Sequence, residues 1–308
     1  MAKKPLRVGI VMDPIESITP YKDSSLAMLL EAERREAEIH YFNQADLKIV
    51  SGTALGRSRR LNVEDSRSNW WRFGEEQEIA LGELDVILMR KDPPFDMEYI
   101  YTTYILDRAK HAGALIMNDP EALRNMNEKA YTAWFPDCVP ATLITRSMDE
   151  MRAFLAEHGH AVIKPLGGMG GRSIFVIRQG DKNANVVFET LTDYGRQFAM
   201  AQTYIPEISL GDKRILLFDG EPVPYALARI PSDEDNRGNL VMGAVGKGQP
   251  LSDRDREICA RVGPALRDGG VIFAGIDVIG DYLTEVNVTS PTGMREIDEQ
   301  FDLNTAGL

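Results

Sequence analysis

The chain has 308 residues, of which 44% are apolar, so it can form the cores of two or three domains of ordinary size. Its 47 aspartates and glutamates outnumber its 35 lysines and arginines, and the net charge of -12 argues against a nucleic-acid-binding or membrane-surface protein. We therefore expect any phosphate-bearing ligand to be held by a local cluster of donors.

The sequence carries no pattern for a membrane span or a secretory signal. No apolar run reaches about 18 residues, and the run near the start is interrupted at Asp13-Pro14. Cys138 and Cys259 stand far apart and lack the spacing of a zinc site or a redox pair. These features predict a cytoplasmic protein with two buried cysteines.

Residues 1–122 alternate between apolar strands and amphipathic helices. Strand-like runs at 6–12, 39–42, 84–89 and 114–117 flank helical patterns at 24–35 and 97–110. Because such alternation builds a mostly parallel sheet, we expect an N-terminal α/β domain. The polar, arginine-rich stretch between Phe42 and Leu84 predicts a hairpin and a surface loop.

The rest of the chain has more antiparallel character, so we expect an α/β fold with α+β features in its C-terminal half. Helical patterns lie at 127–134, after the capping box that begins at Ser147, and at 253–267. Strand patterns lie at 161–164, 173–177, 197–204, 214–218, 223–230, 271–279 and 282–288. The polar stretch at the start of 231–245 predicts a mobile loop.

The stretch from Lys164 to Phe175, KPLGGMGGRSIF, has four glycines in five residues between two apolar runs. Glycines at such spacing let consecutive backbone N–H groups form a nest for an anion, and Gly168, Gly170 and Gly171 are candidates for holding phosphate. The stretch fits neither the P-loop motif nor the dinucleotide-binding motif. Taken alone, the stretch is more typical of a flexible hairpin turn than of a phosphate site, and Lys164 could be an exposed strand end.

A second cluster lies in the runs 274–279 and 282–288. Asp277 is embedded among apolar residues, and Glu285 and Asn287 are two positions apart, so they share one face of a strand. A hairpin about Gly280-Asp281 brings the three side chains together. Carboxylate and amide oxygens suit a hard cation such as Mg²⁺, and a metal would relieve the cost of burying Asp277. The alternative for Glu285 is the solvent face of an edge strand.

Eight stretches resemble, in the same order, the ATP-grasp ligases and among them the bacterial glutathione synthetase family. They are IVMDPI, DSSLAMLLEA, DVILMRKDPPFD, NEKAYTAWF, KPLGGMGGRSIF, GDKRILLFDGEPVPYALARIP, RGNL and DVIGDYLTEVNVTSPTGMREI. One departure is Gly167, which stands where related enzymes carry an acidic residue. The resemblance implies an N-terminal domain over 1–122, a central ATP-grasp lid domain over 123–203 and a C-terminal ATP-grasp domain over 204–308.

The resemblance also implies the residues that bind ATP and its metal. Lys129 and Lys164 would neutralise the phosphates, and Asp212 would accept a hydrogen bond from the ribose. The metal would be Mg²⁺, with Mn²⁺ as the alternative, held by Asp277, Glu285 and Asn287. The hinge segment Gln202, Thr203, Tyr204 and Ile205 would present backbone groups to the adenine.

The implied reaction joins γ-glutamylcysteine to glycine through an acyl phosphate, with release of ADP and phosphate. No protein nucleophile is needed, so catalysis would depend on cations, for which Arg214 and Arg229 are the candidates. The loop 231–245, with Arg237 and Asn239, would close over the site, the alternative being a surface loop without a role. Arg90, Ser290 and Thr292 are candidates for binding the substrates.

Two rival functions remain at this point. One is another ATP-grasp carboxylate-amine ligase that acts on a different peptide or amino acid, and the other is a nucleotide-binding module without turnover. The family resemblance further implies a homo-oligomer, with a tetramer expected.

Overall fold

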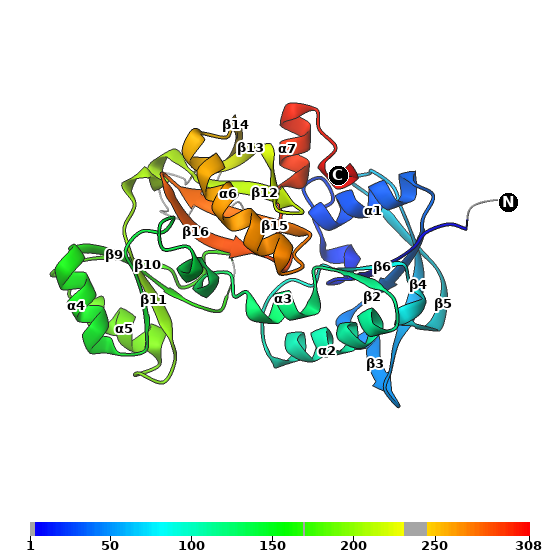
Figure 1. Ribbon diagram of the computed structural model, residues 1–308, viewed down its shortest axis with the longest axis horizontal. Coiled ribbons are helices and arrows are strands. Elements are labelled where there is room, and N and C mark those ends of the chain that lie inside the picture. Colours follow the sequence, from blue (N-terminus) through cyan, green and yellow to red (C-terminus); the bar gives the residue numbers. More distant parts are fainter. Residues whose placement is uncertain (1–3, 169, 231–244) are drawn as a thin grey trace.

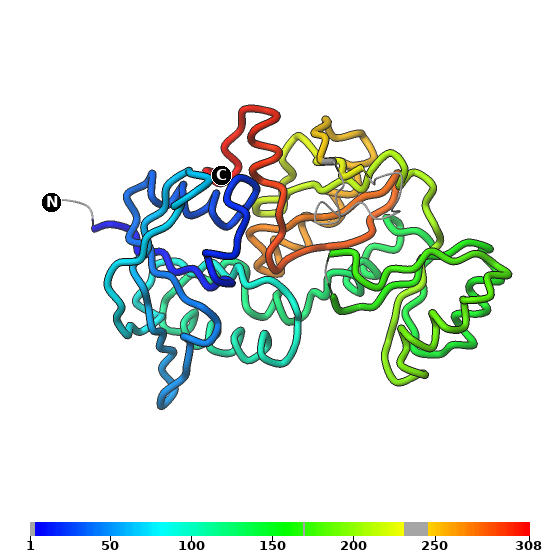
Figure 2. Tube along the Cα trace, turned by 180° about the vertical axis from the view of Figure 1, so that it is seen from behind, coloured from blue at the N-terminus to red at the C-terminus, as the bar shows by residue number. Residues whose placement is uncertain are grey.

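The computed structural model describes residues 4–168, 170–230 and 245–308. Their strands form three separate sheets of seven, four and five strands, which follow one another along the chain. Figure 1 shows the first sheet at one end of the molecule, the second at the other, and the third between them. Arg35 Nη2 donates to the carbonyl of Gly307 at 2.8 Å, so the chain returns to its first part, as Figure 2 shows from behind.

The N-terminal sheet has the order β3-β4-β2-β1-β6-β7, with β5 paired to β4. Strands β1, β2, β6 and β7 are parallel to one another, as the alternating sequence pattern predicted. The strands are β1 (Arg7–Val11), β2 (Glu38–Phe42), β3 (Leu47–Val50), β4 (Thr53–Val63), β5 (Trp71–Ala80), β6 (Val86–Met89) and β7 (Leu115–Met117). The helices of this part are α1 (Ser24–Arg34), α2 (Met97–His111) and α3 (Pro120–Asn125).

The stretch between Phe42 and Leu84 holds more regular structure than the sequence predicted. The expected hairpin is present, but the expected surface loop is largely the long antiparallel pair β4 and β5. The guanidinium of Arg59 lies 4.9 Å from the ring centre of Tyr41 and 4.1 Å from that of Phe73. Arginines here cover aromatic rings across the sheet, which explains why a charged stretch forms strands.

The central sheet is antiparallel, with the order β10-β9-β11-β8, and two helices cover one face of it. Its elements are β8 (Thr142–Thr145), β9 (His160–Pro165), β10 (Phe175–Arg178), β11 (Ala199–Thr203), α4 (Met148–His158) and α5 (Ala184–Thr192). The Ser147 side chain accepts from the Glu150 amide and so caps α4 as predicted. The glycine stretch joins the antiparallel neighbours β9 and β10, as expected of a hairpin.

The C-terminal sheet is also antiparallel, with the order β14-β13-β12-β15-β16. Its elements are β12 (Asp212–Phe218), β13 (Glu221–Ile230), β14 (Val245–Pro250), β15 (Phe273–Ile279), β16 (Tyr282–Asn287), α6 (Asp253–Asp268) and α7 (Met294–Phe301). The predicted hairpin about Gly280-Asp281 is confirmed, and it sets Asp277 opposite Glu285. The helix expected at 127–134 is a 3-10 helix over Ala130–Trp134.

Asn118 links the first sheet to the third. Its side chain is buried at the end of β7, and Nδ2 donates to the carbonyls of Phe273 at 2.6 Å and Val288 at 2.7 Å. Its Oδ1 accepts from the amides of Ile272 at 2.8 Å and Phe273 at 2.9 Å. The carboxyl edge of the parallel strands is thereby fixed against the strands that carry Asp277 and Glu285.

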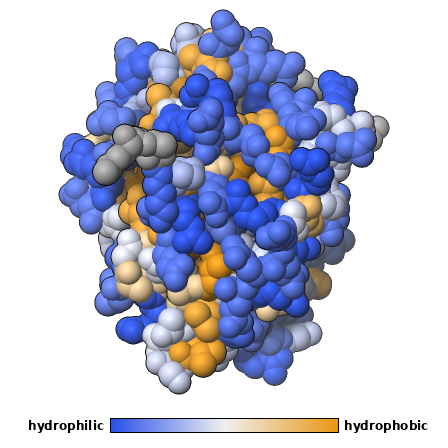
Figure 3. Space-filling model, turned by 90° about the vertical axis from the view of Figure 1, so that its right-hand side faces the viewer, coloured by the Kyte–Doolittle hydropathy of each residue, from blue (hydrophilic) through white to orange (hydrophobic). Residues whose placement is uncertain are grey.

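The surface at the N-terminal end of the molecule is mainly polar, with apolar side chains in patches between hydrophilic ones (Figure 3). In the part of the chain that the structure describes, no helix has both the length and the hydropathy to cross a bilayer.

Candidate active site

A cavity of about 340 Å³ lies where the central and C-terminal sheets meet. The glycine stretch and the cluster of Asp277, Glu285 and Asn287 both line it, although more than a hundred positions separate them in the sequence. The other predicted site residues that line it are Lys129, Lys164, Gly168, Gly170, Gly171, Gln202, Thr203, Tyr204, Ile205, Asp212, Arg214, Arg229, Ser290 and Thr292. Arg90 is not among the lining residues, and Arg237 and Asn239 lie outside the described residues.

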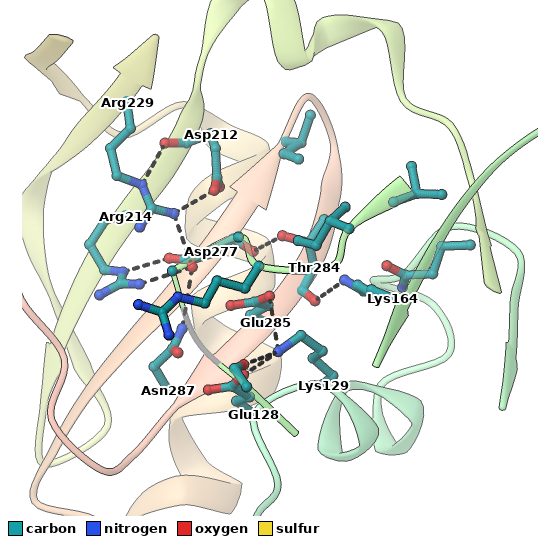
Figure 4. Close-up of a pocket in the computed structure, with 18 of the residues that line it drawn as sticks. Glu128, Lys129, Lys164, Asp212, Arg214, Arg229, Asp277, Thr284, Glu285 and Asn287 are labelled. Carbon is teal, nitrogen blue, oxygen red and sulfur yellow. Dashed lines mark hydrogen bonds and ion pairs between the residues drawn. The ribbon is translucent and has the colours of Figure 1, made fainter. Parts of the chain in front are cut away.

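Asp277 is held by two arginines (Figure 4). Arg214 forms a bidentate ion pair with Asp277, in which Nε donates to Oδ1 at 2.5 Å and Nη2 donates to Oδ2 at 2.9 Å. Arg229 Nη2 lies 2.9 Å from Oδ2. Burial alone would raise the pKa of Asp277, but the two guanidinium groups lower it to about 2. Arginines therefore compensate this buried carboxylate, so its burial alone is no argument for a metal, and the metal site stays a prediction.

Asp212 lies beside the same arginine. Its Oδ2 is 2.5 Å from Arg229 Nη2, while its Oδ1 is buried and has no hydrogen-bond partner among the described residues. Burial raises the pKa of Asp212 to about 7, since the nearby Arg229 offsets only part of the cost of the charge. One oxygen of this carboxyl is thus left for a donor from a ligand.

Two lysines occupy the other side of the cavity. Lys129 Nζ pairs with Glu128, lies 3.7 Å from Glu285 and donates to the carbonyl of Gly168 at 3.0 Å. Lys164 Nζ donates to the carbonyl of Thr284 at 3.3 Å. Lys164 is only 5% exposed, so the alternative of a solvent-facing strand end was wrong. Burial lowers the pKa of Lys164, whereas burial and the charge of Glu285 raise that of Glu128 to about 7.

The glycines of the loop are needed for their backbone conformation. Gly168, Gly170 and Gly171 have φ of 104°, 73° and 72°, in the region that other residues rarely adopt. A Cβ atom added at Gly168 or Gly170 would meet nothing within 4 Å, so lack of space does not explain these glycines. The three glycines line the cavity, and the anion-binding nest stays a prediction.

In the hinge segment, two backbone amides already donate hydrogen bonds within the protein. The amide of Thr203 donates to the carbonyl of Ala141 at 3.0 Å, and that of Tyr204 to His160 at 3.1 Å. The tyrosine ring also stacks on His160, with ring centres 4.0 Å apart. Among the described residues, the amide of Ile205 donates to no acceptor. This amide is therefore available to donate a hydrogen bond to the ring of a bound nucleobase.

An apolar part of the wall was missed by the sequence analysis. It consists of Val162, Ile174, Val176, Ile208 and Ile279, together with Ile205. Such residues give no functional signal in a sequence, because strand residues of a core look the same. A wall of this kind is typical of the apolar part of a small-molecule site.

The sequence analysis also missed Asp92, a charged residue near the predicted substrate residues Arg90 and Ser290. Asp92 lines the cavity, and its Oδ1 accepts from the Ser290 hydroxyl at 2.5 Å. Arg90 lies behind this wall and is 4% exposed, with Nη2 donating to the carbonyl of Pro291 at 2.9 Å. Its Nη1 is buried without a hydrogen-bond partner among the described residues. Arg172 and Glu128 line the cavity as well, and only their position next to a motif could have indicated them.

The oxygen atoms on one wall of the cavity bear on whether a metal ion can bind there. Within the described ranges, no three His, Cys, Asp or Glu side chains form a ready-made metal cluster. Asp277, Glu285 and the Asn287 amide nevertheless offer oxygens on one wall, and a carboxylate retains acceptor capacity beside an arginine. Oxygen donors of this kind fit a hard divalent cation.

Comparison with protein families matches two profiles over most of the chain. Residues 6–124 match "Prokaryotic glutathione synthetase, N-terminal domain", and residues 128–302 match "Prokaryotic glutathione synthetase, ATP-grasp domain". The chain is 55% identical over 303 residues to a glutathione synthetase of Salmonella typhimurium, covering 98% of this chain and 96% of the relative. It is 53% identical over 302 residues to one of Vibrio cholerae, with 98% and 95% covered.

Solved structures with little sequence similarity share the fold. D-cycloserine synthetase superposes with a TM-score of 0.67 at 13% identity, covering 98% of this chain and 96% of the other. D-alanyl-alanine synthetase A from Vibrio cholerae gives 0.60 at 12% identity, covering 99% and 95%. These two likenesses bear on the fold alone.

Proposed function

Because the chain belongs to the prokaryotic glutathione synthetase family, we propose that its cavity is where an ATP-dependent ligase joins γ-glutamylcysteine to glycine. The family makes the chain an ATP-grasp ligase of glutathione biosynthesis. The observation that carries the assignment to this cavity is that the glycine stretch and the carboxylate cluster line it together.

ATP would be bound along the cavity by residues of different chemistry. The apolar wall and the free amide of Ile205 suit the adenine, and the unpartnered Oδ1 of Asp212 suits a ribose hydroxyl. Lys129, Lys164 and the nest of the glycine loop suit the phosphates. Arg237 and Asn239 stay predictions, since they lie outside the described residues.

Asp277, Glu285 and Asn287 would hold Mg²⁺, with Mn²⁺ as the alternative. The cation would supply charge neutralisation at the phosphate oxygens when bound. Its ligands come from the hairpin of β15 and β16, which is rigid because antiparallel pairing and the Asn118 hydrogen bonds fix both strands.

The reaction would pass through an acyl phosphate of the cysteinyl carboxylate, which the glycine amine then opens to the amide. Arg214 and Arg229 would stabilise the charge on the transferred phosphoryl group and on the oxyanion. The protein supplies no nucleophile in this scheme. Cys138 and Cys259 are buried, and burial raises the pKa of both thiols, that of Cys259 to about 12.

We extend the proposal to the organisation of the protein. The chain would divide into a substrate-side domain over 1–122, a lid domain over 123–203 and a C-terminal domain over 204–308. It would work in the cytoplasm as a homo-oligomer, with a tetramer expected. Ser290 and Thr292, which line the cavity, would contact the substrates, and a contact by Arg90, which lies behind the wall, stays a prediction.

The decisive experiment measures phosphate release by the purified protein with Mg-ATP, γ-glutamylcysteine and glycine. Release is expected only when all three are present, together with equal amounts of ADP and tripeptide. Release with another dipeptide but not with γ-glutamylcysteine would favour the rival ligase. Nucleotide binding without any phosphate release would favour the non-catalytic module.

A further inference from the structure

The turn of the β15–β16 hairpin is held by contacts from two other elements. Lys213 Nζ, on β12, donates to the carbonyl of Gly280 at 3.1 Å. Gly280 has a φ of 55°, and a Cβ atom added there would lie 3.1 Å from the Cβ atom of Glu207 in the 3-10 helix Pro206–Leu210. The turn is therefore packed against that helix, while its carbonyl is tied to β12.

A buried carboxylate holds the ammonium group of Lys213. Nζ lies 2.5 Å from Oδ1 of Asp255, which is fully buried in the first turn of α6. The other oxygen, Oδ2, accepts from the amide of Ser252 at 2.9 Å and so completes the cap of that helix. Removing one partner of a buried ion pair leaves the other uncompensated. Lys213 therefore ties the hairpin turn to the start of α6 through a contact that is costly to break.

The position of this turn bears on how β15 and β16 pair. Next to the turn, Val278 pairs with Leu283, a register that would place Asp277 opposite Thr284. A register shift between Asp277 and Val278 instead sets Asp277 opposite Glu285. Thr284 is thereby left as the extra residue, as in a β-bulge. The two carboxylates of the proposed cation site face each other because of this shift.

The shift also shapes the wall of the cavity. The hydroxyl of the extra residue, Thr284, donates to the carbonyl of Asp277 at 3.1 Å, and its own carbonyl accepts from Lys164 Nζ at 3.3 Å. Lys213 lies beside the shift, since its Cα atom pairs with that of Val278 across β12 and β15. Within the described ranges, Lys213 is not among the residues that line the cavity. Any effect of Lys213 on the site must therefore act through the hairpin.

We propose that Lys213 is a positioning residue, which holds the Gly280 turn against α6 and so keeps β15 and β16 in the register that sets Asp277 opposite Glu285. The link to a bound cation rests on the proposed function, whereas the link to the register concerns this chain alone. A residue that only stabilised the fold would, when lost, lower the stability and leave the folded hairpin unchanged. The two roles therefore predict different results in the folded protein.

The test removes the ammonium group with Lys213→Met in the full-length protein. Hydrogen exchange is measured by mass spectrometry well below the Tm of each variant. Exchange at the amides of residues 278–284 should be at least about tenfold faster than in the wild type, with exchange in β13 of the same sheet unchanged. Mn²⁺ binding to the nucleotide-free protein is followed by electron paramagnetic resonance. It should weaken by about 10- to 100-fold, the usual effect of losing a group that orients metal ligands.

Three variants separate positioning from stability. Val262→Ala leaves a cavity at the buried face of α6, so it should lower the Tm and keep the wild-type Mn²⁺ affinity. Lys213→Arg keeps a cation with several donors and should recover most of the affinity that Lys213→Met loses. The double variant Lys213→Met with Asp255→Asn removes the uncompensated carboxylate, so it should regain Tm without regaining Mn²⁺ affinity.

Two results would overturn the inference. One is a Lys213→Met protein that is less stable than the wild type but has wild-type exchange at residues 278–284. The other is faster exchange there with an unchanged Mn²⁺ affinity, which would break the link between the turn and the cation site. A wild type that binds no Mn²⁺ would count against the proposed cation site itself, and hydrogen exchange would then decide the role of Lys213 alone.

Discussion

Replacing Glu285 by glutamine tests the proposed cation site without removing volume. Glu285 lies on β16 opposite Asp277, is 21% exposed at its side chain, and has its nearest cation, Lys129 Nζ, at 3.7 Å. The substitution removes one negative charge and keeps one amide oxygen. We expect kcat to fall by about 10²- to 10³-fold, the range seen when one preorganised electrostatic group is lost.

The same change should leave the ligand-free protein almost as stable as before. Glu285 attracts Lys129, Lys164 and Arg229, but it also repels Glu128 and Asp212, and these effects have opposite signs. Its one ion pair is with Lys129, and a partly exposed ion pair contributes about 0–1 kcal/mol. A residual of about 1 kcal/mol corresponds to a shift in Tm of no more than about 4 °C.

The assay combines steady-state turnover with a Mg²⁺ titration and thermal unfolding without nucleotide. The half-saturating Mg²⁺ concentration should rise at least about tenfold, since one anionic oxygen ligand is lost. Glu157→Gln removes an exposed carboxylate on α4 and serves as the matched control. Wild-type turnover at saturating Mg²⁺ with an unchanged half-saturation point would refute the assignment, and a large drop in Tm would show that Glu285 is a structural ion-pair residue instead.

Three further predictions follow from the buried charges. Lys164→Met removes a buried amine, and burial lowers the pKa of that amine, so the Tm of the ligand-free protein should rise. Calorimetry should show that ATP binds at least about tenfold more weakly, because a cation at the phosphates is lost. Unchanged ATP affinity would contradict this prediction. Asp212→Asn should raise the KM for ATP about tenfold. The pKa of Asp212 is about 7 in the folded protein, against an ordinary value of 3.8. Between these two pH values the folded state holds the proton more tightly, so the free energy of unfolding falls as the pH rises. Between pH 5 and 7.5, urea unfolding should show a smaller decrease in the free energy of unfolding for Asp212→Asn than for the wild type. An equal decrease in both proteins would show that Asp212 does not cause this pH dependence. Burial lowers the pKa of His40 to about 4, against about 6.5 in the unfolded chain, so the folded protein resists protonation of this ring. The contribution of His40 to stability is therefore full above about pH 6.5 and is lost as the pH falls toward 4. A His40→Gln variant should therefore lose less stability over that acid range, and an equal or greater loss would contradict the assignment.

The parts of the site that the sequence predicted are those fixed by local rules. Asp277, Glu285 and Asn287 follow from the two-residue period of strands and from a turn at Gly280-Asp281, both of which are confirmed. The glycine loop follows from the freedom of glycine at positive φ, which is also confirmed. One detail of the hairpin was not predicted: a register shift between Asp277 and Val278 sets Asp277 opposite Glu285, whereas a regular ladder would set it opposite Thr284.

The parts that the sequence missed depend on distant partners. The compensation of Asp277 by Arg214 and Arg229 arises from the register of β15, β12 and β13, which no local pattern specifies. Helix α5 has several β-branched residues and forms a helix because Val187 and its neighbours pack into the core of the central sheet. Asp92 reads as a turn residue before Pro93-Pro94 until Ser290, almost two hundred positions later, lies beside it.

The cavity predicts that stability and activity are linked in this protein. Four carboxylates, Glu128, Asp212, Asp277 and Glu285, face four cations, Lys129, Lys164, Arg214 and Arg229, so the formal charge of this set is zero (Figure 4). A buried set of this kind is tolerated because opposite charges offset one another, and removing one member of an ion pair leaves the other uncompensated. The anionic phosphates of ATP would upset that balance, and a divalent cation would restore part of it. Deleting one fully buried member such as Asp277 should therefore change stability and nucleotide affinity together, whereas paired substitutions such as Asp277→Asn with Arg214→Gln should recover the fold without recovering turnover.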